Sequence, residues 1–203
     1  MNTDIRRHAP AVARNRDAIL DVLRLYLPSR GLVLEVASGS GEHAVHFAEA
    51  SPAELRFQPT DPDPEARISI DAWTASTGLA NVAPALALDA TSPTWPVERA
   101  EIVICVNMIH DAPWAATIGL MRGAARVLTP DGTLLVYGPF RRGGKHTAPS
   151  NAAFDESLRA RDPAAGVRDL ESVVKLARAS GFEAPEIHEM PANNLSLAFR
   201  RGG

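Results

Sequence analysis

The chain has 203 residues, of which 45% are hydrophobic and 22% are charged. This balance is typical of a globular protein with a buried core, and it excludes a disordered or fibrous chain. Lysine and arginine total 21 against 24 acidic residues, which gives a net charge of −3. Because neutralisation of phosphates supplies most of the affinity for nucleic acid, we expect no nucleic-acid partner. The length predicts a single domain over residues 1–203.

The first residues and the cysteine content indicate a cytoplasmic protein without membrane attachment. Residues 1–7 carry charges and have no apolar segment behind them, so they do not resemble a secretory signal. The longest aliphatic runs, such as 102–106, are too short to span a membrane. Cys105 is the only cysteine, and the six histidines show no recognised metal-ligand spacing. We therefore expect neither a disulfide framework nor a metal site.

Apolar runs and helical patterns alternate along most of the chain. Residues 1–30 are predicted to form a leading helical extension that Pro28 ends. The strands that follow are predicted at 32–36, 55–58, 82–88, 102–106 and 133–137, and the helices at 43–50, 65–77 and 113–128. Strands and helices in this alternation predict right-handed crossovers and a parallel, doubly wound sheet.

The carboxyl-terminal end departs from this alternation. A helix is predicted at 169–179, with Asp169 as its cap, and strands follow at 184–190 and 195–199. The link between these two strands is so short that it can only join antiparallel neighbours. We therefore expect the sheet to finish in an antiparallel hairpin.

An insertion follows the fifth predicted strand. Residues 138–147, which contain Gly143 and Gly144, are interpreted as a mobile loop, and 151–161 as an additional helix with Ser150 as its N-cap. An insertion at this point, over residues 138–168, lies over the carboxyl end of the sheet, where ligands bind. We expect it to act as a lid or substrate segment that is ordered only with ligand.

A glycine turn joins the first strand to the next helix. Gly39 and Gly41 let the backbone approach an anionic group at the amino end of that helix. Asp61, at the end of the second strand, can accept hydrogen bonds from both hydroxyls of a ribose. Asp89 ends the third strand and can meet an exocyclic amine of a purine. Glu35 would repel a pyrophosphate and favour a cationic group such as an amine or a sulfonium, which argues against a nicotinamide cofactor.

These residues carry a resemblance to a known family. The segment Glu35-x-Ala37-x-Gly39-x-Gly41 resembles the first motif of class I S-adenosylmethionine-dependent methyltransferases, with Ala37 in place of the usual glycine. Several longer motifs resemble the domain-of-unknown-function 938 family, whose animal members are called methyltransferase-like 26. They are Arg14-Asn15 and residues 36–43, 107–110, 137–140, 150–159 and 168–170.

The resemblance implies a Rossmann-like, seven-stranded, mostly parallel doubly wound α/β sheet with helices on both faces. Its expected strand order is 3-2-1-4-5-7-6, with the last strand antiparallel. It also implies S-adenosylmethionine as cofactor and S-adenosylhomocysteine as product. The residues expected to hold the cofactor are Glu35, Ala37, Ser38, Gly39, Gly41, His43, Asp61, Asp89 and Asn107.

Methyl transfer by direct displacement requires an aligned nucleophile, exclusion of water and, for a hydroxyl or a protonated amine, removal of a proton. His110 is the first candidate base because it follows the fourth strand and histidine titrates near neutral pH. Alternatively, His110 only orders the start of the next helix. Tyr137 is a second catalytic candidate that can orient a substrate, and its alternative role is packing with a hydrogen-bonded tip.

The residues expected on the substrate side are Trp114, Phe140, Asn151, Arg159 and Arg168. Asn151 and Arg159 share one helix face, so this group is either an ion-pair network or a pocket for a carboxylate or phosphate. The basic residues Arg141, Arg142 and Lys145 point to an anionic small molecule, although a solvated loop has the same composition.

The leading hypothesis is methyl transfer from S-adenosylmethionine to a small-molecule acceptor. A regulatory module that binds the same nucleotide without turnover is the first alternative. A nicotinamide-dependent oxidoreductase is the second. The sequence carries no indication of oligomeric state.

Overall fold

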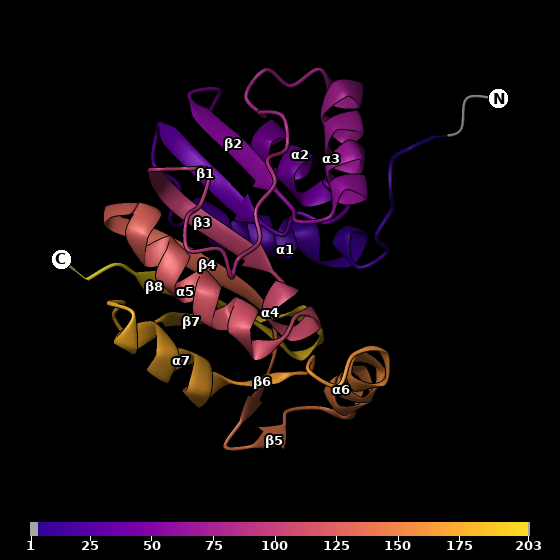
Figure 1. Cartoon of the computed structure of the whole chain (residues 1–203), viewed down its shortest axis with the longest axis vertical. Coiled ribbons are helices and arrows are strands. Elements are labelled where there is room, and N and C mark those ends of the chain that lie inside the picture. Colours follow the sequence, from indigo (N-terminus) through magenta and orange to yellow (C-terminus); the bar gives the residue numbers. More distant parts are fainter. Residues whose placement is uncertain (1–3, 203) are drawn as a thin grey trace.

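A single twisted sheet organises the computed structural model, which describes residues 4–202 (Figure 1). Its main path has the order β2-β1-β3-β4-β8-β7. The strands are β1 (Gly31–Val36), β2 (Leu55–Thr60), β3 (Ala100–Val106), β4 (Leu128–Arg142), β7 (Glu186–Met190) and β8 (Asn194–Arg200). The first four strands pair in parallel, whereas β8 pairs antiparallel with both β4 and β7. The expected antiparallel ending is therefore confirmed.

Helices cover both faces of this sheet (Figure 1). They are α1 (Val12–Arg24), α2 (Glu42–Glu49), α3 (Pro64–Thr77), α4 (Met108–Asp111), α5 (Trp114–Val127), α6 (Pro149–Arg161) and α7 (Leu170–Ala179), with a 3-10 turn η1 (Pro191–Asn193). Helices α1 and α2 share one core with Val33 and Ile104, while α5 and α7 share the other with Leu34 and Val103. Both faces are buried, which explains why these strands are continuous apolar runs. The fold class is confirmed.

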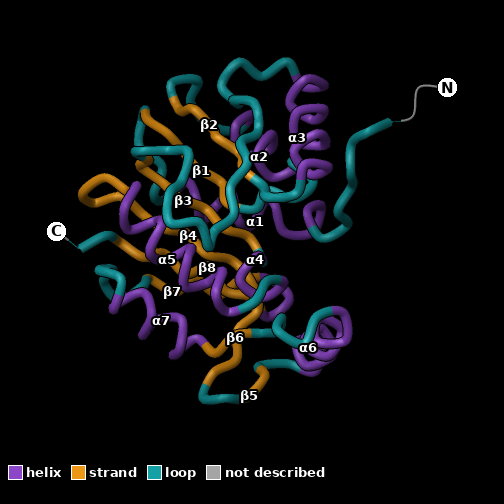
Figure 2. Tube along the Cα trace, in the orientation of Figure 1, coloured by secondary structure: helices purple, strands orange, loops and turns teal. Residues whose placement is uncertain are grey.

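The third predicted strand, over residues 82–88, does not form. Only isolated bridges join Val82 to Phe57 and Leu86 to Thr60, and Figure 2 draws the connection between α3 and β3 as a loop. Pro84 lies in this segment and Pro59 faces it from β2. A proline has no N–H to donate to a ladder, so pairing is interrupted from both sides. The observed order therefore lacks the edge strand of the expected 3-2-1-4-5-7-6.

The interpretation of residues 138–147 as a loop is wrong. Strand β4 continues to Arg142, turns through Gly143 and Gly144, and pairs with β5 (Lys145–His146). Both glycines have positive φ, 56° and 75°, as the two central residues of a tight hairpin turn require. Phe140 also pairs with Arg168 in β6 (Arg168–Asp169). Pairing with distant segments extends the strand beyond its local pattern.

Two helix starts also differ from expectation. Helix α6 begins at Pro149 with Ala148 at the N-cap position, so Ser150 lies inside its first turn. Proline is well suited to this first position because its missing N–H needs no partner there. Asp169 occupies the N-cap position of α7, but its side chain makes no capping bond in the described structure. Its carboxylate pairs instead with Arg141 at 2.9 Å.

The leading helix is shorter than predicted. Helix α1 spans Val12–Arg24, and described residues 4–9 before it are not helical. Residues 1–3 of the predicted extension lie outside the described residues. In residues 4–202, no helix is long and apolar enough to cross a membrane.

Candidate functional site

The carboxyl ends of four parallel strands bring the predicted site residues to one edge of the sheet. Glu35 precedes the end of β1, Asp61 follows β2, and Asn107 follows β3. Tyr137 of β4 pairs with Val106, the last residue of β3, so it lies at the same level. Ligands of open α/β sheets bind at this edge.

The glycine turn is built for close approach of a ligand. The amide of Gly39 donates to Asp61 Oδ2 at 2.9 Å, which ties the turn to β2. The position that a Cβ on Gly39 would take is open, so the backbone there is accessible. At Gly41 a Cβ would lie 2.7 Å from the Ile70 Cα, and φ is 94°, so only glycine fits.

Three adjoining cavities follow this edge. The glycine-turn cavity, of about 330 Å³, is lined by residues of the turn together with Glu35, His43, Asp61 and Asn107. The Asp89 cavity, also about 330 Å³, shares Ala37 and Met108 with it. The Arg14 cavity, of about 340 Å³, shares Ala11, Asn15 and Asn107 with the glycine-turn cavity.

Glu35 is the most perturbed acid of the glycine-turn cavity. Its side chain is buried, and its Oε2 has no hydrogen-bond partner among residues 4–202. Burial raises the pKa of Glu35 to about 7, and the nearby Asp61 carboxylate adds to this rise, although a hydrogen bond from Ser38 opposes it. A buried carboxyl group with a free oxygen is suited to a cationic partner.

The two aspartates are held by backbone amides. Asp61 is buried; its Oδ2 accepts from Gly39 and its Oδ1 from the Asp63 amide at 2.9 Å. Each carboxylate oxygen can accept a further hydrogen bond, so both remain available to ligand hydroxyls. Asp89 lines its own cavity, and its Oδ1 accepts from the amide and hydroxyl of Thr91, both at 2.8 Å.

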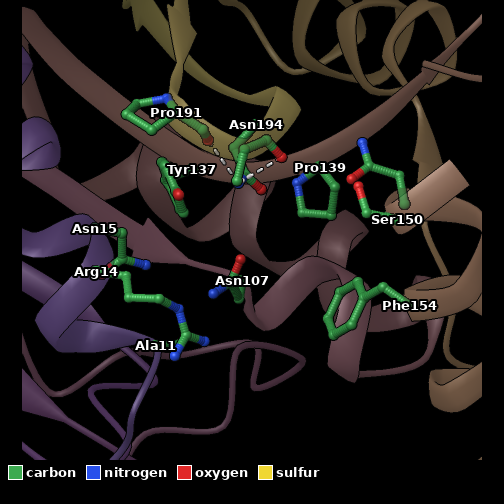
Figure 3. A pocket seen from close by; sticks show the side chains of 12 residues that line it. Ala11, Arg14, Asn15, Asn107, Tyr137, Pro139, Ser150, Phe154, Pro191 and Asn194 are labelled. Atoms are coloured by element: carbon green, nitrogen blue, oxygen red, sulfur yellow. Dashed lines mark hydrogen bonds between the residues drawn. The ribbon is translucent and has the colours of Figure 1, made fainter. Parts of the chain in front are cut away.

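The Arg14 cavity collects residues from five parts of the chain (Figure 3). Arg14 and Asn15 come from α1, Asn107 from the end of β3, and Tyr137 from β4. The remaining lining residues come from the N-cap of α1, from β4, α6 and η1, and from the start of β8: Ala11, Pro139, Ser150, Asn151, Phe154, Pro191, Ala192 and Asn194. Because Asn107 borders both this cavity and the glycine-turn cavity, the two spaces meet there.

The chain matches a known protein family over almost its whole length. A family described as "Protein of unknown function (DUF938)" matches residues 6–201. The chain belongs to this family. The match covers every helix and strand of the fold.

Solved structures share the fold of this DUF938 chain. An O-methyltransferase family protein from Burkholderia thailandensis has a TM-score of 0.81 at 18% identity, with 95% of this chain and 58% of that chain covered. The mitomycin 7-O-methyltransferase MmcR has a TM-score of 0.79 at 20% identity, covering 94% and 55%. Human N-acetylserotonin methyltransferase, solved in complex with SAM, has a TM-score of 0.76 at 16% identity, covering 95% and 53%. The DUF938 chain thus spans little more than half of these proteins and has a methyltransferase-type Rossmann-like fold.

His110 lies on the other face of β4 from the Arg14 cavity. Tyr137 and Pro139 line that cavity, and neighbouring residues of a strand point to opposite faces. A Cβ on Gly138, between them, would overlap the His110 ring. His110 is fully buried and packs edge-on against Phe140 with ring centroids 5.0 Å apart. Its role as the base is not supported by this position.

The protonation state of His110 agrees with its burial. Burial and the nearby Arg168 lower the pKa of His110 to about 3, so the ring is neutral at pH 7. Its Nδ1 accepts from the Arg168 amide at 3.3 Å, and its carbonyl accepts from the Gly166 amide at 2.8 Å. Within residues 4–202, its Nε2 is unpaired. These contacts order the chain around β6.

The residues expected on the substrate side separate into two groups. Asn151 lines the Arg14 cavity, and its amide donates to Thr147 Oγ1 and to the Asn193 carbonyl at 3.1 and 3.0 Å. Trp114, Phe140, Arg159 and Arg168 line none of the three cavities. The Arg168 guanidinium donates to the carbonyls of Ile109, Ala112 and Ala164, and Arg159 pairs with Asp155 at 3.1 Å. These two arginines therefore hold the α6 segment in place.

Sequence reasoning missed the contribution of α1 to the site. From the sequence, Arg14 and Asn15 were interpreted only as one of the family motifs. In the structure, Asn15 is buried and its Oδ1 lies 2.9 Å from His43 Nε2. The sequence did contain an indication of this role, because Arg14-Asn15 matches a family motif although it lies before the first strand of the sheet.

Proposed function

We propose that this protein transfers a methyl group from S-adenosylmethionine to a small-molecule acceptor. The unpaired, buried carboxyl group of Glu35 beside the glycine turn is the observation that carries the proposal. It would suit a cation in a cavity where Asp61 suits a ribose, and the adjoining Asp89 cavity suits a purine. A second cavity adjoins it at Asn107 and has room for an acceptor.

The residues present fit this cofactor. Glu35 would face its amino group or sulfonium, and Asp61 would accept from the ribose hydroxyls. Asp89 would accept from the exocyclic amine of adenine in the cavity that adjoins through Ala37 and Met108. The open backbone at Gly39 permits the close approach that this placement needs.

When bound, S-adenosylmethionine supplies a methyl group on a sulfonium that is already a good leaving group. The chain then has to orient the acceptor and exclude water. Asn107, at the junction of the two cavities, and Tyr137, in the Arg14 cavity, would orient the acceptor. The burial of His110 favours a positioning role through Arg168 and β6 rather than removal of a proton from the acceptor.

The similar structures support this proposal. The mitomycin 7-O-methyltransferase and N-acetylserotonin methyltransferase are named for small-molecule acceptors, and the latter was solved with SAM. Their overall fold is the one that this chain has. Their additional length has no counterpart in the 203 residues of this chain.

The two alternatives predict different behaviour. A module that binds the nucleotide without turnover needs no second cavity, whereas here the Arg14 cavity opens next to the proposed cofactor site. A nicotinamide cofactor would place a pyrophosphate near Glu35, whose carboxylate would repel it.

Calorimetric titration of S-adenosylhomocysteine, with NADH in parallel, tests the proposal. We expect binding of the first and none of the second. Asp61→Ala should weaken binding strongly, because it removes the acceptor of two ligand hydroxyls and releases Gly39. Glu49→Gln, an exposed acid at the end of α2, serves as the control and should leave binding unchanged. Binding of NADH alone would overturn the proposal.

A further inference from the structure

The wall of the Arg14 cavity carries one positive charge and no negative charge. Of its twelve lining residues, Arg14 alone carries a formal charge, and no aspartate, glutamate or histidine is among them. Four asparagines, one serine and one tyrosine supply the remaining polar side chains. The cavity is therefore rich in hydrogen-bond donors and electropositive at one point.

Arg14 differs from the basic residues that the sequence singled out. Arg141 pairs with Asp169 at 2.9 Å and Arg142 with Glu189 at 2.6 Å, so both charges are neutralised. No carboxylate of residues 4–202 lies within 4.0 Å of the Arg14 guanidinium. Figure 3 shows this side chain extending into the cavity toward Asn107. Its charge is thus free for a ligand, at the junction with the glycine-turn cavity.

The neighbouring Asn15 amide also favours an anionic ligand. Asn15 Oδ1 is occupied by His43 Nε2, so the Asn15 amide retains its N–H donors. Arg14, Asn15 and Tyr137 line the same cavity, and the first two side chains both act to lower the pKa of Tyr137. Both groups would stabilise a negative charge at that point. Burial is the larger effect, and the pKa of Tyr137 is raised overall.

No group in the lining is suited to remove a proton at neutral pH. Tyr137 with a raised pKa stays protonated, and arginine and asparagine are not bases. An acceptor that reacts here without a base has to arrive with an available electron pair, as an anion or a neutral amine does. A carboxylate meets this requirement and is also the natural partner of a guanidinium.

We propose that the methyl acceptor is a small organic acid whose carboxylate pairs with Arg14 and itself receives the methyl group; this rests on the proposed function. A carboxylate oxygen forms the bond to the methyl carbon while the carbon–sulfur bond breaks and the sulfur keeps the electron pair. No proton moves, and a carboxylate and a sulfonium become a neutral methyl ester and a neutral thioether. Because the neutral ester cannot form an ion pair with Arg14, the product binds more weakly than the acid.

The cavity limits the size of this acid. A volume of about 340 Å³ is at the small end of ligand sites. Phe154 and Pro139 provide apolar walls that suit a ring or a short aliphatic chain. The class is therefore a monocarboxylate with a compact apolar body.

Binding of matched acid and amide pairs tests the recognition. The protein saturated with S-adenosylhomocysteine is titrated with benzoate, phenylacetate, cinnamate and hexanoate and with the neutral amide of each. We expect at least one acid to bind about tenfold or more tightly than its amide, and Arg14→Gln to abolish this difference. Arg24→Gln, an exposed arginine at the end of the same helix, should retain it. No acid preferred over its amide, or a preference that survives Arg14→Gln, would overturn the proposal.

The second arm tests the chemistry. The acid that binds most tightly is incubated with methyl-labelled S-adenosylmethionine, and the product is treated with mild base. A methyl ester releases labelled methanol, which is the expected result. Label that stays in a base-stable product, or no labelled product, would overturn the assignment of the carboxylate as acceptor. The proposed function fails separately, if S-adenosylhomocysteine itself does not bind.

Discussion

His43 Nε2 lies 2.9 Å from Asn15 Oδ1, and this contact joins the helix after the glycine turn to the amino-terminal helix α1. Both side chains are buried. Burial lowers the pKa of His43 to about 4, so the ring is neutral at pH 7 and can donate one N–H to Asn15. Through this pair, α1 becomes a wall shared by the glycine-turn and Arg14 cavities.

Asn15→Ala should therefore affect both cavities. It leaves a buried imidazole donor unpaired, which costs about 1 to 3 kcal/mol of the free energy of unfolding. We expect a lower melting temperature and weaker binding of S-adenosylhomocysteine. Asn81→Ala, whose amide donates to the carbonyls of Ala48 and Leu55 away from the site, is the control for stability loss alone. Equal ligand affinities of the two variants would argue against the shared wall.

Glu35→Gln should change the pH dependence of stability. The pKa of Glu35 rises from an ordinary value of 4.5 to about 7 in the folded protein. Between these values the folded state binds the proton more tightly, so the native protein loses up to about 3 kcal/mol of stability as pH rises from 4.5 to 7. The glutamine variant lacks this loss. Its stability relative to the parent should increase from pH 5 to pH 8 in denaturant titrations.

The same variant tests the cation site. Ionised Glu35 binds a cation better than the protonated form, so affinity for S-adenosylhomocysteine, which carries an amino group, should rise as pH increases from 6 to 8. Glu35→Gln should bind more weakly and lose this rise. A parallel pH dependence in parent and variant would contradict the assignment of Glu35 to the amino group or sulfonium.

Ala37→Gly should stabilise the protein. Ala37 has φ 60°, a left-handed conformation that costs an alanine about 1 to 2 kcal/mol. Glycine removes this cost but has a more flexible unfolded chain, so the expected net gain is up to about 1 kcal/mol. Ala125→Gly, inside helix α5, should instead lose about 1 kcal/mol. Thermal unfolding of both variants checks the opposite signs.

Gly138→Ala should destabilise the protein through His110. The added Cβ would overlap the buried imidazole, and overpacking of this kind costs about 1 to 3 kcal/mol. In a His110→Ala background the same change should cost much less, because the ring is gone. A double-mutant cycle measures this coupling. His110→Ala should leave the affinity for S-adenosylhomocysteine unchanged, in contrast to Asp61→Ala.

The segment before α1 should slow ligand release. Ala9 and Ala11 of this segment line the glycine-turn cavity, and the Ala9 amide donates to Glu42 Oε2 at 2.7 Å. The Arg7 amide donates to Ser69 Oγ at 2.8 Å on α3. Deletion of residues 1–9 should accelerate dissociation of S-adenosylhomocysteine in stopped-flow measurements. Deletion of residues 1–5 retains both contacts and should have no effect. Identical dissociation rates for the two deletion variants would contradict a role of this segment in retaining the ligand.

The local sequence was sufficient to predict much of this molecule. The apolar run of β1, the glycines after it and the acid at the end of β2 follow one another closely in the chain, so short-range patterns specify them. The hairpin of β7 and β8 was predictable for the same reason, because a short link excludes a parallel crossover. The family motifs added the expectation of the cofactor.

Contacts between distant segments decided the rest. Strand β4 extends to Arg142 because β5 and β6 pair with its end. The edge strand fails because Pro59 and Pro84 lack the N–H groups that a ladder needs, so only isolated bridges form. His110 faces away from the Arg14 cavity because alternate residues of β4 point to opposite faces of the sheet. Helix α1 borders the site because it packs against α2, a contact that local sequence patterns do not record. Sequence patterns record the neighbours of a residue along the chain, whereas a binding site is made of residues that packing brings together.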